Sequence, residues 1–225
     1  MVKRRLSSTI EDYLQSIYSL ETEGERVISA RLARWMRVSP PTAWSTVQRM
    51  QRDGLVDLDA KKTVHLTAKG RELAETVARR HRLSERFLSD VLGLGWAEAH
   101  GEAHHFEHGM SDLIEQRIMK LMDYPKTCPH GSPIPMPGVG ATLDPSWVPL
   151  DTLALEERGT IRFISEELEE DLELLQYLES HALKPGREVV IREKVPSAGV
   201  LVLHNGDEDV SLGMQVASRI RAERA

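Results

Sequence analysis

The spacing of hydrophobic residues divides the chain into a helical first part and a strand-rich end. Near the start, apolar residues recur every three or four positions from Ile10 to Tyr18, which is the repeat of one face of an α-helix. This pattern predicts a helix over residues 8–22. Ser8 followed by Glu11 has the spacing of a capping box, so we expect this pair to cap the helix.

Three further elements are predicted after this helix. A short second helix is expected from Ser29. A third helix is expected from Ser39, which suits a cap, through two prolines that suit a first turn, to Gly54, which suits a C-terminal stop. Residues 55–67, LVDLDAKKTVHLT, predict two short strands around a Lys-containing turn. Helices followed by a hairpin form the winged helix-turn-helix pattern. Trp44 lies beside the apolar face, so we expect it to pack.

The rest of the chain predicts a second helical part and a small β-domain. Thr67 is expected to cap a long helix that ends near Gly93, and residues 96–122 predict two further helices. Residues 124–149 contain seven of the 11 prolines, so we interpret them as a linker. The runs GTIRFIS, REVVIRE, GVLVLHNG and EDVSLG then predict strands of a small barrel, with a helix, EEDLELLQYLESHAL, between the first two.

These elements predict a mainly α-helical chain with small β parts. We expect a winged helix-turn-helix domain over residues 1–74, a helical domain over 75–123, a Pro-rich linker over 124–149 and a barrel-like domain over 150–225.

Composition agrees with an ordinary globular protein that works in a reducing cytoplasm. The 225 residues are 40% hydrophobic, and we find no apolar run long enough for a membrane span and no signal-peptide stretch after the basic start. One cysteine excludes an internal disulfide framework. The net charge is −6, but residues 1–75 carry more Lys and Arg than Asp and Glu. A mildly basic first domain permits DNA binding without requiring it.

Residues 39–52 offer a polar face opposite their apolar face, and we interpret them as a recognition helix. Small hydroxyl side chains near a helix N-terminus can approach phosphates and thymine methyl groups, and arginines suit phosphates. Two lysines at the tip of the hairpin would reach a neighbouring groove or the backbone. Because winged helices also bind proteins, that alternative stays open from the pattern alone. The candidate DNA-binding residues are Ser39, Pro41, Thr42, Ser45, Gln48, Arg49, Arg52, Lys61 and Lys62.

The middle of the chain gathers histidines and glutamates on helical faces. His81 and Glu85 stand four residues apart on the predicted long helix. The next predicted helix carries four more potential ligands on one face, namely His100, His104, Glu107 and His108. Imidazole and carboxylate are ligands of Mn²⁺, Fe²⁺ and Zn²⁺. One such pair is usually a helix-surface pair, but six residues together indicate metal binding.

Other candidate chemistry is absent from the sequence. The zinc-protease pattern HExxH, a Gly-rich phosphate loop and a GxSxG elbow do not occur. Cys128 lies in the Pro-rich segment and is assigned no chemistry. The remaining histidines stand alone in predicted turns or strands, and we expect no site at His65, His130, His181 or His204.

Several stretches resemble the diphtheria toxin repressor family of metal-dependent transcription regulators, namely EDYLQSIYSLE, VSPPTAWSTVQRMQRDGLV, LTAKGRELA, RRHRLSERFLSDVLGL, HGEAHHFEHGMSD and CPHGSPIP. The runs LKPGREVVI and VSLG resemble the family's SH3-like domain, which is related to ferrous-transport accessory modules. The resemblance covers nearly the whole chain. It implies a homodimeric repressor of metal-uptake genes, not an enzyme, that binds a pseudo-palindromic double-stranded DNA operator when loaded with Fe²⁺ or Mn²⁺. It also implies that the helical domain dimerises.

The resemblance implies two metal sites in each subunit. The primary, regulatory site would use Asp12, His104, Glu107 and His108. The ancillary site would use His81, Glu85 and His100, completed from the C-terminal domain by Glu166 and Glu169.

The sequence departs from both main branches of that family. Iron-type members place methionine and cysteine at the positions of Asp12 and His104, and manganese-type members place aspartate and glutamate there. Gln15 occupies a position where some manganese-type members have a glutamate ligand. Without a sulfur ligand the preference shifts to harder ions such as Mn²⁺, whereas the added imidazole shifts it back toward Fe²⁺. We expect Mn²⁺, with Fe²⁺ as the alternative, and binding of Zn²⁺, Co²⁺ or Ni²⁺ in vitro.

Two other functions stay open from the residues alone. A winged-helix regulator could respond to an organic ligand or a redox change, with the histidines on its surface. A metalloenzyme would need an open coordination position and a substrate pocket beside the ion.

Overall fold

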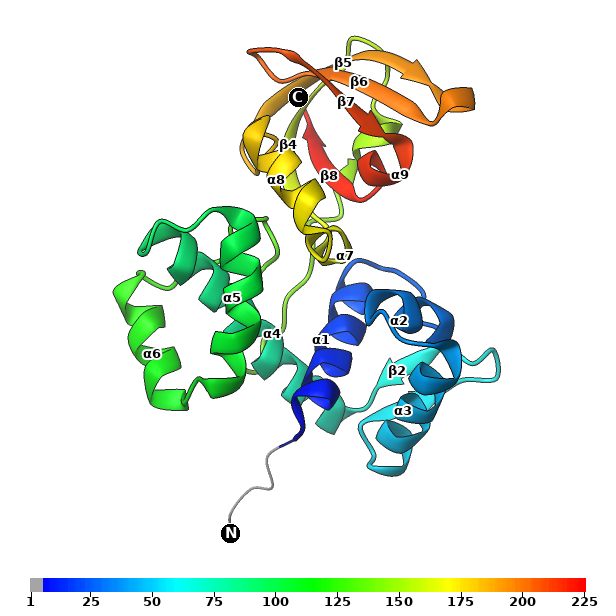
Figure 1. Cartoon of the computed structure of the whole chain (residues 1–225), viewed down its shortest axis with the longest axis vertical. Helices are drawn as coiled ribbons and strands as arrows, with labels where there is room; N and C mark the ends of the chain where they lie inside the picture. Colours follow the sequence, from blue (N-terminus) through cyan, green and yellow to red (C-terminus); the bar gives the residue numbers. More distant parts are fainter. Residues whose placement is uncertain (1–5) are drawn as a thin grey trace.

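The structure of the chain is a computed structural model that describes residues 6–225, so the basic start MVKRR lies outside the described residues. Figure 1 shows three parts, an N-terminal head, a helical body and a C-terminal β-domain, which meet near the short helix α7 (Glu166–Glu169). Within residues 6–225 no helix is both long and apolar enough to cross a membrane.

The head has the predicted winged helix-turn-helix order. It consists of α1 (Ser8–Thr22), α2 (Ser29–Trp35), α3 (Pro40–Arg52), β1 (Val56–Leu58) and β2 (Val64–Leu66). The apolar faces of the helices bury Leu14, Ile17 and Val47 in one core, which stabilises the head through the removal of apolar surface from water.

The start of α3 is as predicted, but the start of α1 is not. Ser39 Oγ accepts a hydrogen bond from the Thr42 amide, at 3.3 Å. The capping box predicted for Ser8 and Glu11 is wrong, because α1 already begins at Ser8. Its N-cap is the extended residue Ser7, whose side chain makes no capping hydrogen bond to the described residues.

The helix α4 (Ala68–Asp90) joins the head to the body. Its first half places Ala74 and Ala78 in the core of the head, and its second half packs against α5 (Trp96–Gly109) and α6 (Asp112–Leu121). The boundary expected after residue 74 therefore lies inside a continuous helix. The side chains of α4 face the head at one end and α5 at the other.

The C-terminal domain is an antiparallel β-sheet with short helices. Within the described residues the strand order is β3-β8-β4-β5-β6-β7. The four predicted β-type runs fall on β4, β5, β6 and β7, whereas β3, β8 and the short helix α9 were not predicted. The bounds are β3 (Val148–Pro149), β4 (Arg158–Ile164), α8 (Leu172–Ser180), β5 (Glu188–Val195), β6 (Val200–His204), β7 (Asp209–Gly213), α9 (Met214–Ala217) and β8 (Ile220–Arg224), with 3-10 turns at Leu150–Thr152 and Pro196–Ala198.

The Pro-rich segment packs against the C-terminal domain as it passes between the parts. The Ile164 amide donates to the His130 carbonyl oxygen at 2.9 Å, next to β4. Gly131 has φ 91°, and a Cβ atom there would lie 2.1 Å from the Arg162 carbonyl oxygen, so only glycine fits this close approach. As a result, Cys128 and His130 are buried rather than exposed in a free linker.

Polar side chains fix the head to the C-terminal domain. The Arg31 guanidinium lies 2.6 Å from a carboxylate oxygen of Glu167, which is the second residue of α7. Ser165 Oγ donates to Glu23 Oε2 at 2.7 Å. Burial raises the pKa of Glu23 to about 7, and the negative charge of Glu166 adds to this rise. Glu23 is therefore protonated more readily in the folded chain than in the unfolded chain.

We expect Glu23→Gln to stabilise the protein at alkaline pH. An unfolded glutamate has a pKa of about 4.3, whereas the pKa of Glu23 in the folded chain is about 7. Between these two pH values Glu23 keeps its proton in the folded state and loses it in the unfolded state. The stability that the folded state gains by holding this proton is complete below the unfolded pKa and is lost as the pH rises through the folded pKa. Gln is neutral at every pH, so the effect of Glu23→Gln on the free energy of unfolding should be more favourable at about pH 8 than at about pH 5, by on the order of 1 kcal/mol.

Urea unfolding of the metal-free protein at the two pH values measures this effect. Glu72→Gln, at an exposed position, is the matched control and should leave the pH dependence as in the parent chain. The same pH dependence in the parent and in Glu23→Gln would contradict the expectation.

Candidate metal centre and DNA-binding surface

The packing of α4 against α5 turns two helical faces toward each other. On α4, His81 and Glu85 are one turn apart, and on α5 the spacing of His100, His104 and Glu107 repeats one face. These residues are buried at positions that a plain helix pair would fill with apolar side chains, apart from His104, which is partly exposed. Buried groups of this kind require partners.

A first cluster joins the head to the body. Asp12 on α1 meets Glu107 and His108 on α5, and one ligand-type atom from each lies within 4.8 Å of the other two. His108 Nε2 is 3.1 Å from Asp12 Oδ1 and 3.5 Å from Glu107 Oε1. On the other side of the ring, His108 Nδ1 is 2.7 Å from Glu11 Oε2. Both ring nitrogens of His108 therefore face carboxylate oxygens, and an ion that took Nε2 as a ligand would leave the ring proton on Nδ1, donated to Glu11.

The charges of the first cluster suit a cation. Burial raises the pKa of Asp12, and the nearby negative charge of Glu107 raises it further against the opposing effect of His108. Burial would raise the pKa of Glu107, but His81 and His104 outweigh it and hold this pKa at about 2. Asp12 Oδ1 and Glu107 Oε1 are buried and accept no well-formed hydrogen bond from the described residues. Two such oxygens beside an imidazole nitrogen fit a divalent ion.

A second cluster lies between the body and α7. His81, Glu85, His100 and Glu169 bring ligand-type atoms within 4.8 Å of one another, and all four residues are buried. Glu85 Oε1 is 3.2 Å from His81 Nε2 and 2.9 Å from His100 Nδ1. Both carboxylate oxygens of Glu169 lack a hydrogen bond to residues 6–225.

The Pro-rich segment adds two more side chains to this second cluster. His130 Nδ1 lies 3.2 Å from Glu169 Oε1 and 3.6 Å from Glu85 Oε1, and Cys128 Sγ is 3.9 Å from the same nitrogen. The expectation that His130 stands alone is therefore wrong. The tight path of the backbone at Gly131 carries this histidine inward. The only sequence signal for it was the close pair of a cysteine and a histidine.

The second cluster concentrates charge in the interior. Burial raises the pKa of Glu169 to about 8, and Glu85 raises it against the opposing effect of His130. Burial would lower the pKa of His130, but Glu169 and Glu85 outweigh it and raise the pKa well above its usual value. Carboxylate, imidazole and thiol donors around unsatisfied buried oxygens also fit a divalent ion.

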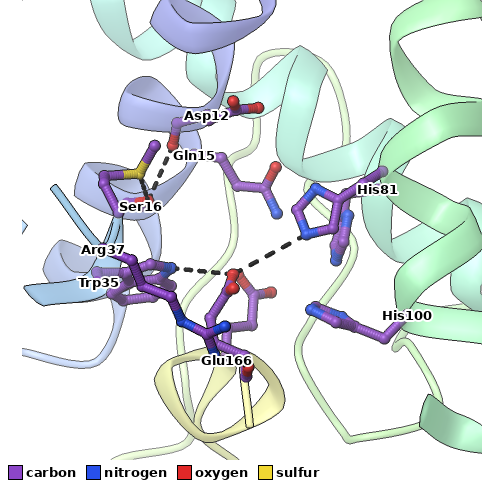
Figure 2. A pocket seen from close by; sticks show the side chains of 11 residues that line it. Asp12, Gln15, Ser16, Trp35, Arg37, His81, His100 and Glu166 are labelled. Carbon is purple, nitrogen blue, oxygen red and sulfur yellow. Dashed lines mark hydrogen bonds and ion pairs between the residues drawn. The ribbon is translucent and has the colours of Figure 1, made fainter. Parts of the chain in front are cut away.

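Two of the expected ligands lie differently from the expectation. Glu166 Oε1 is 2.5 Å from Arg82 Nε, and its other oxygen accepts a hydrogen bond from Ser19, so it forms a buried ion pair apart from the imidazoles. His104 is brought together with Glu107 and His81 rather than with Asp12 and His108, and its Nδ1 is 3.7 Å from Glu107 Oε1. Figure 2 shows His81 and His100 on one wall of a pocket that faces Asp12 and Gln15 of α1, with Glu166 below.

The head presents the expected DNA-binding residues to solvent. All nine of them are exposed along α3 and at the hairpin tip. Trp44 differs from the expectation, because it is only half-buried and lies outside the apolar cluster of the head. The Lys62 ammonium lies 5.9 Å from the centre of the Trp44 ring, which links the hairpin tip to α3.

Comparison with protein-family models assigns a description to each part of the chain. Residues 5–64 match "Iron dependent repressor, N-terminal DNA binding domain" and residues 67–136 match "Iron dependent repressor, metal binding and dimerisation domain". Residues 148–224 match the FeoA domain.

Whole-chain relatives agree with these matches. The chain is 37% identical over 227 residues to the iron-dependent repressor IdeR of Mycobacterium leprae. The alignment covers 97% of this chain and 98% of the relative. It is 39% identical over 228 residues to a diphtheria toxin repressor of Corynebacterium glutamicum, with 97% of each covered.

Solved structures point the same way. A manganese-dependent transcriptional repressor in complex with manganese superposes with a TM-score of 0.84 at 30% identity, over 96% of this chain and 100% of that one. The manganese regulator SloR superposes with a TM-score of 0.79 at 33% identity, over 96% and 98%.

Divalent ions should stabilise the fold, and His130 should contribute to this effect. Saturation at about 100 times the dissociation constant adds about 2.7 kcal/mol. We expect His130→Ala to weaken Zn²⁺ binding by at least about 10-fold and to reduce the rise in melting temperature. Competition with a chelator and thermal unfolding measure the two effects. His65→Ala, on the exposed hairpin, is the control, and equal Zn²⁺ affinity in both variants would argue against a ligand at position 130.

Proposed function

Because the chain belongs to the diphtheria toxin repressor family of metal-dependent DNA-binding transcriptional repressors, which are not enzymes, we propose that a divalent ion controls its operator affinity by fixing the head to the body. One observation carries this proposal. Asp12 belongs to the head, whereas Glu107 and His108 belong to the body, and the three side chains converge.

The side chains of the first cluster act as a switch. A bound ion supplies the positive charge that two neighbouring carboxylates need. Without it, Asp12 and Glu107 repel each other, so the arrangement with α1 against α5 is disfavoured. When the charge is balanced, Asp12 holds the head in one position relative to the body. Coupling of this kind is typically about 1–3 kcal/mol, or roughly 5- to 150-fold in affinity.

The proposed ligands form two sets. The primary set is Asp12, Glu107 and His108, with His104 beside them as a fourth candidate. The ancillary set is His81, Glu85, His100 and Glu169, to which the structure adds His130 and Cys128 as candidates. Glu166, which was expected in the ancillary set, is proposed instead to hold α7 through its ion pair with Arg82.

The donors favour Mn²⁺ or Fe²⁺ in the primary set. It offers oxygen and imidazole nitrogen without sulfur, which suits Mn²⁺, and each imidazole shifts the preference toward Fe²⁺. The ancillary set includes a thiol, so Zn²⁺, Co²⁺ or Ni²⁺ should bind there in vitro.

The operator is proposed to be a pseudo-palindromic double-stranded DNA site bound by a homodimer. Two copies of α3 would then enter successive major grooves, about 34 Å apart. Ser39, Thr42 and Ser45 lie at the exposed N-terminal end of α3, where side chains approach base edges. Arg49 and Lys62 would contact phosphates.

The dimer face is proposed on α6 and the neighbouring turn. Leu113 and Leu121 on α6 are 60% and 66% exposed, and Tyr124 beyond it is 57% exposed. Contiguous large apolar side chains on a surface indicate an interface. This face lies on the part of the body away from the head in Figure 1, which leaves α3 free to meet DNA.

His108→Ala should remove metal-dependent operator binding without unfolding the protein. Losing the imidazole between Asp12 and Glu107 removes the connection between head and body, so affinity in Mn²⁺ should fall by roughly 5- to 150-fold to the metal-free level. Fluorescence anisotropy with labelled promoter DNA measures this. His105→Ala lies on the same helix but is exposed and should behave as the parent chain. If His108→Ala still responded fully to Mn²⁺, the proposed primary set would be wrong.

Leu113→Glu together with Leu121→Glu should convert the dimer to a monomer. Two buried charges opposite their copies would outweigh the apolar area gained on association. Sedimentation measures the mass, and operator affinity should fall with it. Leu155→Glu, 59% exposed on the C-terminal domain, is the control and should stay dimeric. A dimeric double variant would place the interface elsewhere.

A further inference from the structure

A cavity of about 190 Å³ lies where the three parts of the molecule meet. Figure 2 shows its walls, with Asp12, Gln15 and Trp35 of the head on one side and His81 and His100 of the body on the other. The third wall is α7 and the residue that follows it, Glu170. Glu170 belongs to neither of the two ligand sets described above.

His100 directs an available nitrogen into this region. Its Nδ1 lies 2.9 Å from Glu85 Oε1, and a carboxylate only accepts hydrogen bonds, so the proton belongs on Nδ1. The lone pair is then on Nε2, which is buried and has no hydrogen-bond partner among residues 6–225. A carboxylate behind an imidazole is the usual support of a histidine that ligates a metal.

His104 also lies between two carboxylates, at longer distances. Its Nδ1 faces Glu107 Oε1 at 3.7 Å, and its Nε2 faces Glu170 Oε1 at 3.9 Å. The rings of His100 and His104 have centroids 5.1 Å apart and stand at 82° to each other. Ligand-type atoms of His100, His104 and Glu170 all lie within 4.8 Å of one another.

We propose that His100, His104 and Glu170 form a third cation site, which takes a borderline divalent ion such as Zn²⁺ or Co²⁺. Two imidazole nitrogens and one carboxylate oxygen suit these ions, and the cavity leaves room for water in the remaining position. This site takes His104, the fourth candidate of the primary set, and His100 from the ancillary set, and the switch proposed above keeps Asp12, Glu107 and His108. The second cluster also retains enough donors without His100, namely His81, Glu85, Cys128, His130 and Glu169.

The third site would connect all three parts of the chain through one residue. Glu170 Oε1 accepts a hydrogen bond from Trp35 Nε1 at 3.3 Å, and the Glu170 carbonyl oxygen accepts one from Arg37. Trp35 and Arg37 belong to the head, His100 and His104 to the body, and Glu170 to the C-terminal domain. An ion there therefore ties the C-terminal domain to the head without using α1.

Counting bound Co²⁺ ions tests the third site. In the full-length protein we expect Glu170→Gln to bind one Co²⁺ fewer per chain than the parent, measured by equilibrium dialysis and by visible absorption. Glu173→Gln removes the same charge from an exposed position three residues away and should bind as many ions as the parent. Equal stoichiometry in Glu170→Gln and Glu173→Gln would overturn the proposal.

A second variant separates this site from the primary one. Asp12→Asn should also lose one Co²⁺, but a different one, so Asp12→Asn with Glu170→Gln should lose two. If the double variant lost no more than Asp12→Asn alone, the two residues would share one ion and the third site would not exist. If Glu170→Gln bound one Co²⁺ fewer but Asp12→Asn bound as many as the parent, only the primary set would be refuted.

The fluorescence of Trp35 provides an independent measurement of binding at the third site. Zn²⁺ at Glu170 should alter the environment of the Trp35 indole, so emission should change on titration in the parent chain. Trp35→Phe identifies the part of the signal that belongs to this residue among the four tryptophans. A Trp35 response that persists undiminished in Glu170→Gln would also overturn the proposal.

Discussion

The approach of two carboxylates, Asp12 of the head and Glu107 of the body, is the constraint on which the arrangement of the molecule depends. Both lie partly or wholly out of water, and each has an oxygen without a well-formed hydrogen bond from the described residues. In such surroundings two charged carboxylates repel each other unless a positive charge or a proton lies between them. His108 lies between them, with Nε2 3.1 Å from Asp12 Oδ1 and 3.5 Å from Glu107 Oε1, and Glu11 faces the other nitrogen of its ring. On the proposed primary set, a bound divalent ion would balance both carboxylates at once, and the position of the head would then depend on that ion.

The C-terminal domain uses neighbouring carboxylates for different purposes. Glu166 meets Arg82, whose guanidinium also donates to the Pro133 carbonyl oxygen at 2.6 Å. This fixed internal cation gives α7 a charged partner within the chain itself. Glu169, one turn later, has no such cation and faces His130 instead, at 3.2 Å. Removing one partner of a buried ion pair costs several kcal/mol, so the Arg82 pair gives the second cluster a rigid base.

The sequence predicted the helices and the shared faces of the histidines and glutamates on α4 and α5 because these depend on local spacing. His81 with Glu85, and the residues of α5, share helical faces wherever the helices pack, and the four β-type runs alternate as strands do. The failures depend on tertiary structure. Nothing in the spacing of the Pro-rich segment shows that Gly131 allows close contact with β4 and so turns His130 inward. In the same way, Glu166 pairs with Arg82 rather than with an imidazole, and these two residues are 84 positions apart in the sequence. The same limit applies to β3 and β8, which pair at a distance.

His81 couples the two clusters through opposite sides of one ring. Its Nδ1 is 2.5 Å from Glu107 Oε2, in the first cluster, and its Nε2 is 3.2 Å from Glu85 Oε1, in the second. A neutral imidazole has one proton to place. If Nε2 serves as a ligand in the second cluster, the proton is fixed on Nδ1 and is donated to Glu107. That hydrogen bond orients the Glu107 carboxylate and leaves Oε1 directed at Asp12 and His108. On the proposed ligand sets, filling the second cluster would therefore prepare the first, and because coupling between binding sites is reciprocal, filling the first would strengthen binding at the second by the same factor.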